Sequence, residues 1–208
     1  MTARDEMLAR IRAALAEVEP VGVERRYREV GSLDGGEVVA RFVERVEDYG
    51  ATVVRSSDPA AAVSRLLSGR VVIAADLLAV LRPAGVELVE DTDLTARELD
   101  EFDAALTTSA AACAETGSIA LDGGPGQGRR AITLVPDMHV CIVRTADIVE
   151  TVPELVDRLA PSAREGRPIV IVSGPSATSD IELDRVEGVH GPRRLIVVLH
   201  DQPASAED

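Results

Sequence analysis

The side chains best suited to chemistry gather near the C-terminus, in Ser173–Glu182 (SGPSATSDIE) and Gly188–Pro192 (GVHGP). The first segment follows the apolar run Ile169–Val172, and open α/β sheets bind ligands at the carboxyl ends of such strands. Its hydroxyl groups can donate hydrogen bonds to an anion, and Gly174 lets the backbone approach a ligand closely. We expect a carboxylate or phosphate to bind here, although a hydroxyl-rich cap between a strand and a helix explains the composition equally well.

A second candidate is the turn Glu115–Ser118 (ETGS). A carboxylate beside a Thr-Gly-Ser turn can act as a nucleophile or general base, which makes Glu115 the candidate catalytic residue. A solvated turn residue fits the sequence equally. Burial would decide between the two, because it controls the pKa of the carboxyl group.

The sequence gives less support to a serine hydrolase or a metal site than to the two candidates above. Ser176 within GPSAT lacks the second glycine of the nucleophile elbow, so a serine hydrolase is disfavoured. Asp137 and His139 lie two residues apart and would share one face of a strand. No His, Asp and Glu spacing here demands a metal, so we expect a hydrogen-bonded His139 and no metal site.

The glycine cluster Gly123–Gly128 (GGPGQG) resembles a phosphate-binding loop in spacing only. Arg129 and Arg130 stand where that motif requires a lysine and a Ser/Thr. A phosphate-binding loop also opens a helix, whereas we expect a strand here. The sequence therefore favours a hairpin turn.

Composition narrows the class of partner. The formal net charge of −14 and the 2% content of aromatic residues disfavour binding to nucleic acid and to anionic membrane surfaces. No apolar run is long enough to span a membrane, and the N-terminus lacks the apolar block of a signal peptide, so we expect a cytoplasmic protein. Cys113 and Cys141 lie in apolar stretches and are expected to be buried, inert thiols.

Apolar spacing predicts an N-terminal helical extension that packs loosely or docks on a partner chain. Thr2 and Asp5 form its capping pair. Its apolar stripe consists of Leu8, Ile11, Leu15 and Val18. Residues 21–33 show no period, so residues 1–33 are interpreted as a helix and a linker. The main domain is expected to span residues 34–201, with a flexible tail at 202–208.

The main domain begins with alternating helices and strands, which is typical of a parallel sheet covered on both faces. Asp34 caps a helix that Gly50 ends, and Asp58 with Pro59 opens another. In the first of these helices, we expect a buried stripe formed by Val39, Phe42, Val46 and Tyr49. Closely spaced apolar segments then predict hairpins or a mixed sheet at Ala104–Leu106, Ser118–Leu121, Ala131–Val135 and Val140–Val143.

Four motifs together resemble the LUD-domain family, of the lactate utilization protein C type. They are AETGSIAL (Ala114–Leu121), PDMH (Pro136–His139), SGPSATSDIE and GVHGP, in that order. The resemblance covers residues 34–201. It implies an α/β fold with a Rossmann-like layered sheet, similar to the CoA-transferase and ribose-phosphate-isomerase superfamily.

The resemblance also implies a role in oxidising L-lactate to pyruvate together with iron–sulfur partner proteins. This chain lacks ferredoxin-type cysteine motifs and resembles the cluster-free member, so we expect no cofactor of its own. The ligand would be a small carboxylate or another anion. The candidate ligand-binding residues are Thr116, Gly117, Ser118, His139, Ser173, Gly174, Ser176, Thr178, Asp180, Glu182, His190 and Gly191.

Two alternatives stay open. The chain could be a stand-alone enzyme on a small acyl or phosphorylated substrate, similar to a CoA transferase or an isomerase, with Glu115 as the reacting group. Alternatively, residues 173–192 could form an interface for partner subunits. The sequence also leaves open whether copies of the chain associate into a homo-oligomer.

Overall fold

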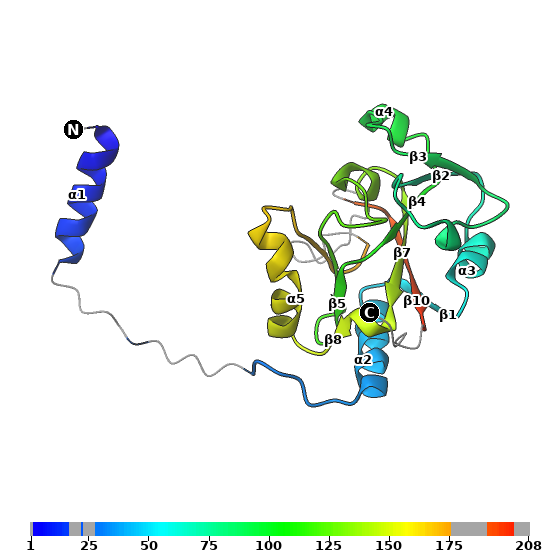
Figure 1. Cartoon of the computed structure of the whole chain (residues 1–208), viewed down its shortest axis with the longest axis horizontal. Helices are drawn as coiled ribbons and strands as arrows, with labels where there is room; N and C mark the ends of the chain where they lie inside the picture. The colour runs from blue at the N-terminus through cyan, green and yellow to red at the C-terminus, as the bar shows by residue number, and fades with distance from the viewer. Residues whose placement is uncertain (1, 17–21, 23–27, 176–190, 202–208) are drawn as a thin grey trace.

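The computed structural model describes residues 2–16, 22, 28–175 and 191–201. Figure 1 shows a layered α/β body with the N-terminal helix α1 (Ala3–Leu15) standing apart from it. The expected capping box is present, since the Asp5 N–H donates to the Thr2 hydroxyl and the Thr2 N–H donates to the Asp5 carboxylate. No residue of α1 is buried, and its apolar residues Met7, Ile11 and Leu15 are exposed.

Six parallel strands form the central sheet, in the order β1-β10-β7-β4-β2-β3 (Figure 1). In that order their bounds are Thr52–Ser56, Arg194–His200, Met138–Arg144, Ala104–Thr108, Arg70–Ile73 and Glu87–Glu90. The central strands β7 and β4 are apolar and almost entirely buried. Layers on both sides of the sheet account for this pattern.

A second sheet of four strands packs against one face of the central sheet. Its order is β8-β5-β6-β9, with bounds Ile148–Val149, Ala111–Cys113, Ser118–Leu121 and Val170–Val172. Strands β5 and β6 form an antiparallel hairpin, and β9 is antiparallel to β6. Ile119 and Leu121 of β6 share a core cluster with Val197 and Leu199 of β10, which joins the two sheets.

Helices complete the layers. The α-helices of the body are α2 (Gly35–Asp48), α3 (Pro59–Leu66), α4 (Ala96–Leu99) and α5 (Val152–Arg164). The 3-10 helices are η1 (Ala79–Leu81), η2 (Arg130–Thr133) and η3 (Thr145–Asp147). Helix α2 packs into the core between the sheets through Phe42 and Val46, α3 covers the opposite face of the central sheet, and α5 covers the outer face of the second sheet.

The layered α/β class expected from the sequence is confirmed, with two local corrections. The prediction of a strand at Ala131–Val135 is wrong, because the chain forms the 3-10 helix η2 there. The Arg130 side chain donates to Thr133 Oγ1 and closes this helix. The glycine cluster therefore connects β6 to η2 and is not a hairpin turn. The expected burial of Tyr49 is also wrong, because this residue caps the end of α2 and is exposed.

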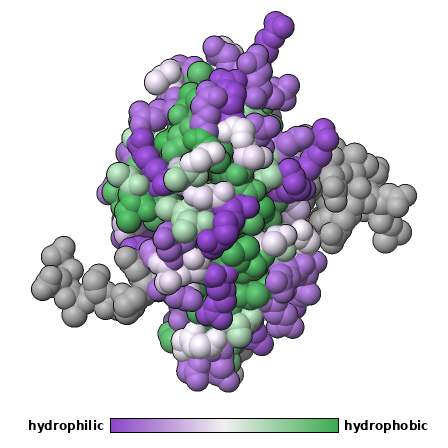
Figure 2. Space-filling view, turned by 90° about the vertical axis from the view of Figure 1, so that its right-hand side faces the viewer, coloured by the Kyte–Doolittle hydropathy of each residue, from purple (hydrophilic) through white to green (hydrophobic). Residues whose placement is uncertain are grey.

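The surface of the body carries scattered apolar residues. On the side drawn in Figure 2, green apolar residues lie between purple hydrophilic ones. Exposed aliphatic side chains of this scattered kind are normal for a folded protein. Within the described residues, we find no helix with both the length and the apolar character needed to cross a membrane.

Candidate functional site

Two of the sequence motifs meet in a hydroxyl cluster, formed by Thr116, Ser118 and Ser173. Thr116 Oγ1 donates to Ser118 Oγ at 2.8 Å, and Ser118 Oγ lies 2.7 Å from Ser173 Oγ. The pairing of β6 with β9 explains this contact. Ile119 stands opposite Val172 in that antiparallel ladder, so the neighbouring residues Ser118 and Ser173 also face each other.

The hydroxyl cluster has a buried middle member and an exposed end. Ser118 is buried, whereas Ser173 is exposed. If Ser118 donates to Ser173, the Ser173 hydroxyl keeps its own O–H for an acceptor at the surface. Hydrogen bonds in a chain polarise one another, which makes the outer hydroxyl a stronger donor than an isolated serine. Such a group can bind a carboxylate oxygen.

A glycine in each motif allows close packing against the C-terminal part of α2. Gly117 has a φ of +62°, and a Cβ there would lie 2.8 Å from the backbone carbonyl carbon of Arg45. Gly174 has a φ of +87°, and a Cβ there would lie 2.9 Å from Cβ of Tyr49. Only glycine combines this backbone conformation with so little space. Helix α2 therefore fixes where the two motifs meet.

The third motif reaches the same region through its last glycine. A Cβ at Gly191 would lie 3.2 Å from the carbonyl oxygen of Pro175. The ends of the SGPS and GVHGP segments are therefore in contact. The other candidate residues of these segments lie outside the described residues: Ser176, Thr178, Asp180, Glu182 and His190.

The strand that precedes Ser173 is not the kind of strand expected from the sequence. Strand β9 is an edge strand of the second sheet, antiparallel to β6, and it does not belong to the parallel sheet. The rule that ligands bind at the carboxyl ends of parallel strands therefore does not apply to Ser173. The position of Ser173 depends instead on the antiparallel pairing of β9 with β6.

Glu115, the candidate catalytic residue, lies beside the hydroxyl cluster in sequence and is 43% exposed. Its Oε1 atom contacts Nη2 of Arg28 at 2.9 Å. Its backbone N–H donates to the carbonyl oxygen of Glu150. The ion pair occupies one carboxylate oxygen at the surface, and the catalytic role of Glu115 stays a prediction.

Glu150 is a structural residue of this region that none of the sequence motifs indicates. Its carboxylate is 3% exposed, accepts the backbone N–H groups of Ser32 and Leu33 at 2.5 and 2.6 Å, and pairs with Arg28 at 3.2 Å. We call residues 28–33 the strap. These partners stand more than a hundred positions away in the chain, so no local pattern around Glu150 could have identified it.

His139 lies elsewhere, in the core of the central sheet. Its Nε2 atom is 2.8 Å from Thr107 Oγ1, and burial, together with the charge of Arg130, lowers its pKa to about 4. Cys141, on the same strand, contacts the same threonine, and burial raises the pKa of its thiol to about 12. Among the described residues, no three His, Cys, Asp or Glu side chains gather where they could hold a metal ion.

The glycine cluster after β6 is organised by Asp122. Its carboxylate accepts hydrogen bonds from Ser162 Oγ and the Gln127 amide, and it pairs with Arg167 at 3.2 Å. Burial alone would raise the pKa of Asp122, but these hydrogen bonds and the nearby positive charge hold it below its ordinary value. The loop is therefore built around a buried carboxylate of the protein itself, which occupies donors that a phosphate would need.

The LUD domain family matches residues 73–200, which include the hydroxyl cluster and Gly191. The chain belongs to the LUD-domain family. Lactate utilization protein C of Deinococcus radiodurans is 45% identical to this LUD-domain chain over 202 residues and covers 95% of both proteins. Lactate utilization protein C of an Exiguobacterium strain is 36% identical over 104 residues, which are 48% of this chain and 45% of that protein.

A solved structure agrees with the LUD-domain assignment. The crystal structure of a DUF162 family protein from Deinococcus radiodurans has a TM-score of 0.72 and is 40% identical, covering 81% of this chain and 99% of that one. The likeness supports the Rossmann-like, layered α/β fold of this LUD-domain chain. It extends well beyond any single motif.

Proposed function

We propose that this LUD-domain chain is the cluster-free subunit of an L-lactate utilization system and binds a small carboxylate at its hydroxyl cluster. In this proposal it supports the oxidation of L-lactate to pyruvate by partner proteins that carry iron–sulfur clusters. The relatives named lactate utilization protein C support the process. The hydrogen-bonded hydroxyls of Thr116, Ser118 and Ser173 support the class of ligand.

The chemistry of the hydroxyl cluster suits binding better than oxidation. A carboxylate oxygen can accept the O–H of Ser173, and hydrogen bonds to a charged acceptor are stronger than neutral ones. Oxidation of lactate to pyruvate removes two electrons and two protons, and serine and threonine side chains accept no electrons. The proposal therefore assigns electron transfer to the partners and the handling of substrate or product to this chain.

Growth of a deletion strain tests the process. With L-lactate as the sole carbon source, we expect the deletion to abolish growth, and with pyruvate we expect growth to be unchanged. The native gene should restore growth on L-lactate. Normal growth of the deletion strain on L-lactate would contradict the proposed role.

Co-purification tests the partners. A tagged copy of the chain, isolated from cells grown on L-lactate, is expected to bring down proteins with the visible absorption of iron–sulfur clusters. A chain isolated alone under these conditions would argue against an assembled system.

Calorimetric titration with L-lactate and with pyruvate tests the ligand. Ser173→Ala removes the outward-facing O–H, and we expect binding to weaken by about ten- to a hundredfold, because a hydrogen bond to a charged group contributes about 1.5–3 kcal/mol. Ser57→Ala changes an exposed serine far from the cluster in sequence and should bind as the native chain does. Equal affinities in Ser173→Ala and native protein would remove the hydroxyl cluster from the proposal.

A stand-alone enzyme acting on a small acyl or phosphorylated substrate is the second candidate. The observation in its favour is that Glu115 directly precedes Thr116 of the hydroxyl cluster and is accessible to solvent. A substrate screen with Glu115→Gln as the comparison tests it. Turnover that survives this substitution would exclude Glu115 as nucleophile or base.

A further inference from the structure

The N-terminal helix α1 has an apolar side that its own chain leaves exposed. Met7, Ile11 and Leu15 follow one another at intervals of four residues, so they lie on one side of the helix. Their exposed fractions are 63%, 48% and 57%. A helix of 13 residues is marginally stable in water on its own, because most helices in proteins depend on packing of an apolar face. A partner surface would supply that packing.

Helix α5 carries a second exposed apolar row. Leu155 and Leu159 pack on the second sheet, whereas Val152 and Val156 are 41% and 58% exposed. Two alanines continue the row at helical intervals of four and three residues. We call this row the α5 stripe: Val152, Val156, Ala160 and Ala163. Helices α1 and α5 each contain 13 residues, so one can lie along the whole of the other.

The face of the second sheet that α5 covers is left partly open. Ile171 stands opposite Ala120 in the ladder of β9 with β6, and residues directly opposite each other in a ladder point to the same face. Ala120 shares a core cluster with Leu155 of α5. Ile171 therefore lies on the α5 side of the sheet, yet it is 56% exposed. This layer has room for another helix.

The chain that leads from α1 enters the body beside the first turn of α5. The Gly31 N–H donates to the Glu154 carboxylate at 3.2 Å, and the Thr151 hydroxyl donates to the carbonyl oxygen of Glu29 at 3.5 Å. The connection from α1 to the strap contains the 12 residues 16–27. A chain of that length spans at most about 40 Å, about twice the length of either helix. It is long enough for α1, which stands apart from its own body in Figure 1, to reach a second copy.

Charge favours the same contact. Helix α1 has three arginines and two acidic residues, whereas residues 28–201 contain 17 arginines and 29 acidic residues. Arg12 follows Ile11 in α1, and the exposed Asp157 follows Val156 in α5. Opposite charges around an apolar contact favour the correct partner and orientation.

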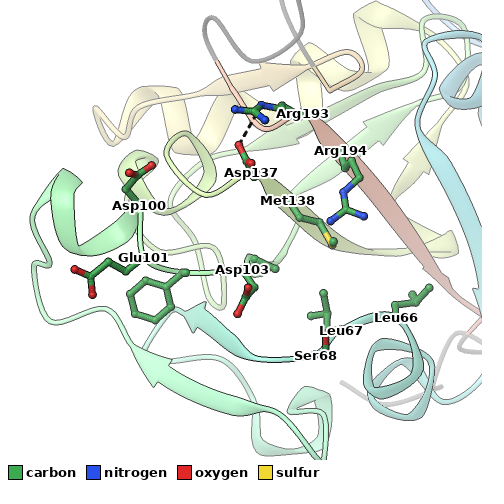
Figure 3. Close-up of a pocket in the computed structure, with 12 residues that line it drawn as sticks. Leu66, Leu67, Ser68, Asp100, Glu101, Asp103, Asp137, Met138, Arg193 and Arg194 are labelled. Carbon is green, nitrogen blue, oxygen red and sulfur yellow. Dashed lines mark ion pairs between the residues drawn. The ribbon is translucent and has the colours of Figure 1, made fainter.

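A cavity at the amino ends of the central strands offers α1 no comparable surface. Its volume is about 520 Å³, and Figure 3 shows charged side chains around it, with Asp137 paired to Arg193 at 3.4 Å. The apolar lining residues Leu67, Phe102 and Met138 are buried. The apolar side of α1 therefore fits the α5 stripe better than this cavity.

We propose that two copies of the chain exchange their N-terminal helices, so that α1 of each copy packs its apolar side on the α5 stripe of the other. Exchange of an identical element between two copies closes a two-fold symmetric dimer. Every contact then forms twice, and both exposed rows of both copies are buried. The proposal concerns association and does not depend on a ligand at the hydroxyl cluster.

The mass of the full-length chain in solution, measured by light scattering after size-exclusion chromatography, is the first test. The native chain is expected to be a dimer. Ile11→Asp and Val156→Asp should each raise the dissociation constant about a hundredfold, because each places an unpaired carboxylate in both contacts and costs about tenfold per contact. Ala9→Asp, on the opposite side of α1, and Val80→Asp, exposed in η1, are the controls and should remain dimers. A monomeric native chain, or a dimer that Ile11→Asp leaves intact, would overturn the proposal.

A mixture of the two variants separates exchange from packing within one chain. Ile11→Asp keeps a native α5 stripe and Val156→Asp keeps a native α1, so a mixed dimer retains one of the two contacts. Native mass spectrometry should detect the mixed dimer, about tenfold weaker than the native dimer, at concentrations where each variant alone is monomeric. If the mixture is as monomeric as its components, α1 does not pack on a second copy and the proposal fails. Should Val156→Asp not fold, as judged by circular dichroism, Ile11→Asp decides, because α1 lies outside the body.

Discussion

Arg28 forms an ion pair with Glu150, 122 positions further along the chain, through a contact of 3.2 Å between Nη1 and Oε1. Nη2 of the same side chain contacts Glu115 at 2.9 Å. One guanidinium thus links the strap to a buried carboxylate and to the turn that precedes the hydroxyl cluster. The geometry around the candidate site depends on a segment that shares no motif with it.

Replacing the buried carboxylate should weaken the fold. Glu150→Gln keeps the shape of the side chain but turns one acceptor oxygen into a donor and removes the charge that pairs with Arg28. We expect the free energy of unfolding to fall by about 2 kcal/mol, measured by urea denaturation. Glu44→Gln, on the exposed side of α2, is the control and should change it by less than about 0.5 kcal/mol. Equal losses in both variants would show that the Glu150 contacts contribute nothing specific.

Two glycines with similar φ angles allow the stability cost of backbone strain to be measured separately from the cost of a steric clash. Gly117 and Gly123 have φ values of +62° and +67°, but only a Cβ at Gly117 would meet another part of the protein, the backbone of α2. Gly123→Ala should cost about 1 kcal/mol of stability from backbone strain alone, and Gly117→Ala at least about 3 kcal/mol. Thermal unfolding of both variants provides the comparison. Similar midpoints would mean that the close approach to α2 is not needed.

The buried histidine should make stability depend on pH. The unfolded chain protonates His139 near pH 6.5, but the folded chain does so only near pH 4, so the unfolded state binds more protons between these values. Stability should therefore decrease as pH falls from about 6.5 to 4, by up to about 3 kcal/mol from this residue.

Comparison with His139→Gln isolates that contribution. The variant keeps a polar side chain near Thr107 but cannot take up the proton, so its unfolding free energy should fall less over the same pH range. Urea denaturation of both proteins at pH 7 and at about pH 4 measures the difference. Parallel pH profiles would show that the folded protein protonates His139 at an ordinary pH.

The two thiols should be unreactive in the folded protein. Cys113 and Cys141 are buried, and the raised pKa of Cys141, about 12, leaves almost no thiolate at pH 8. We expect dithionitrobenzoate to modify neither thiol in the native state and both after denaturation in guanidinium chloride. Rapid modification of Cys141 in the native protein would contradict the burial of this strand.

Much of the fold follows from local signals in the sequence. The Asp34 cap, the Asp58-Pro59 helix start and the apolar runs of β7 and β10 each depend on residues close together in the chain, and the structure confirms them. The division into two sheets could not be predicted in this way. An apolar run such as that of β9 indicates burial or a strand, but not which strand it pairs with.

In the candidate site, too, the sequence indicates residues of interest but not their contacts with distant parts of the chain. The motifs containing Ser118 and Ser173 were identifiable from their residue types, and the structure brings these two residues together. His139 also belongs to a motif, but its neighbours place it in the core, which a spacing of two residues from Asp137 could not reveal. Glu150 has no motif at all, because its partners come from the strap.

The strap also sets how far the N-terminus can be truncated before the fold is destabilised. Gly31 lies so close to the Glu150 side chain that a Cβ there would collide with it, which shows how tightly residues 28–33 are fitted to the body. A chain trimmed to Arg28 would lose α1 and keep the donors to the Glu150 carboxylate that the structure describes, namely Arg28, Ser32 and Leu33. A chain trimmed to Asp34, the domain boundary expected from the sequence, would leave the buried Glu150 carboxylate without any of these three donors.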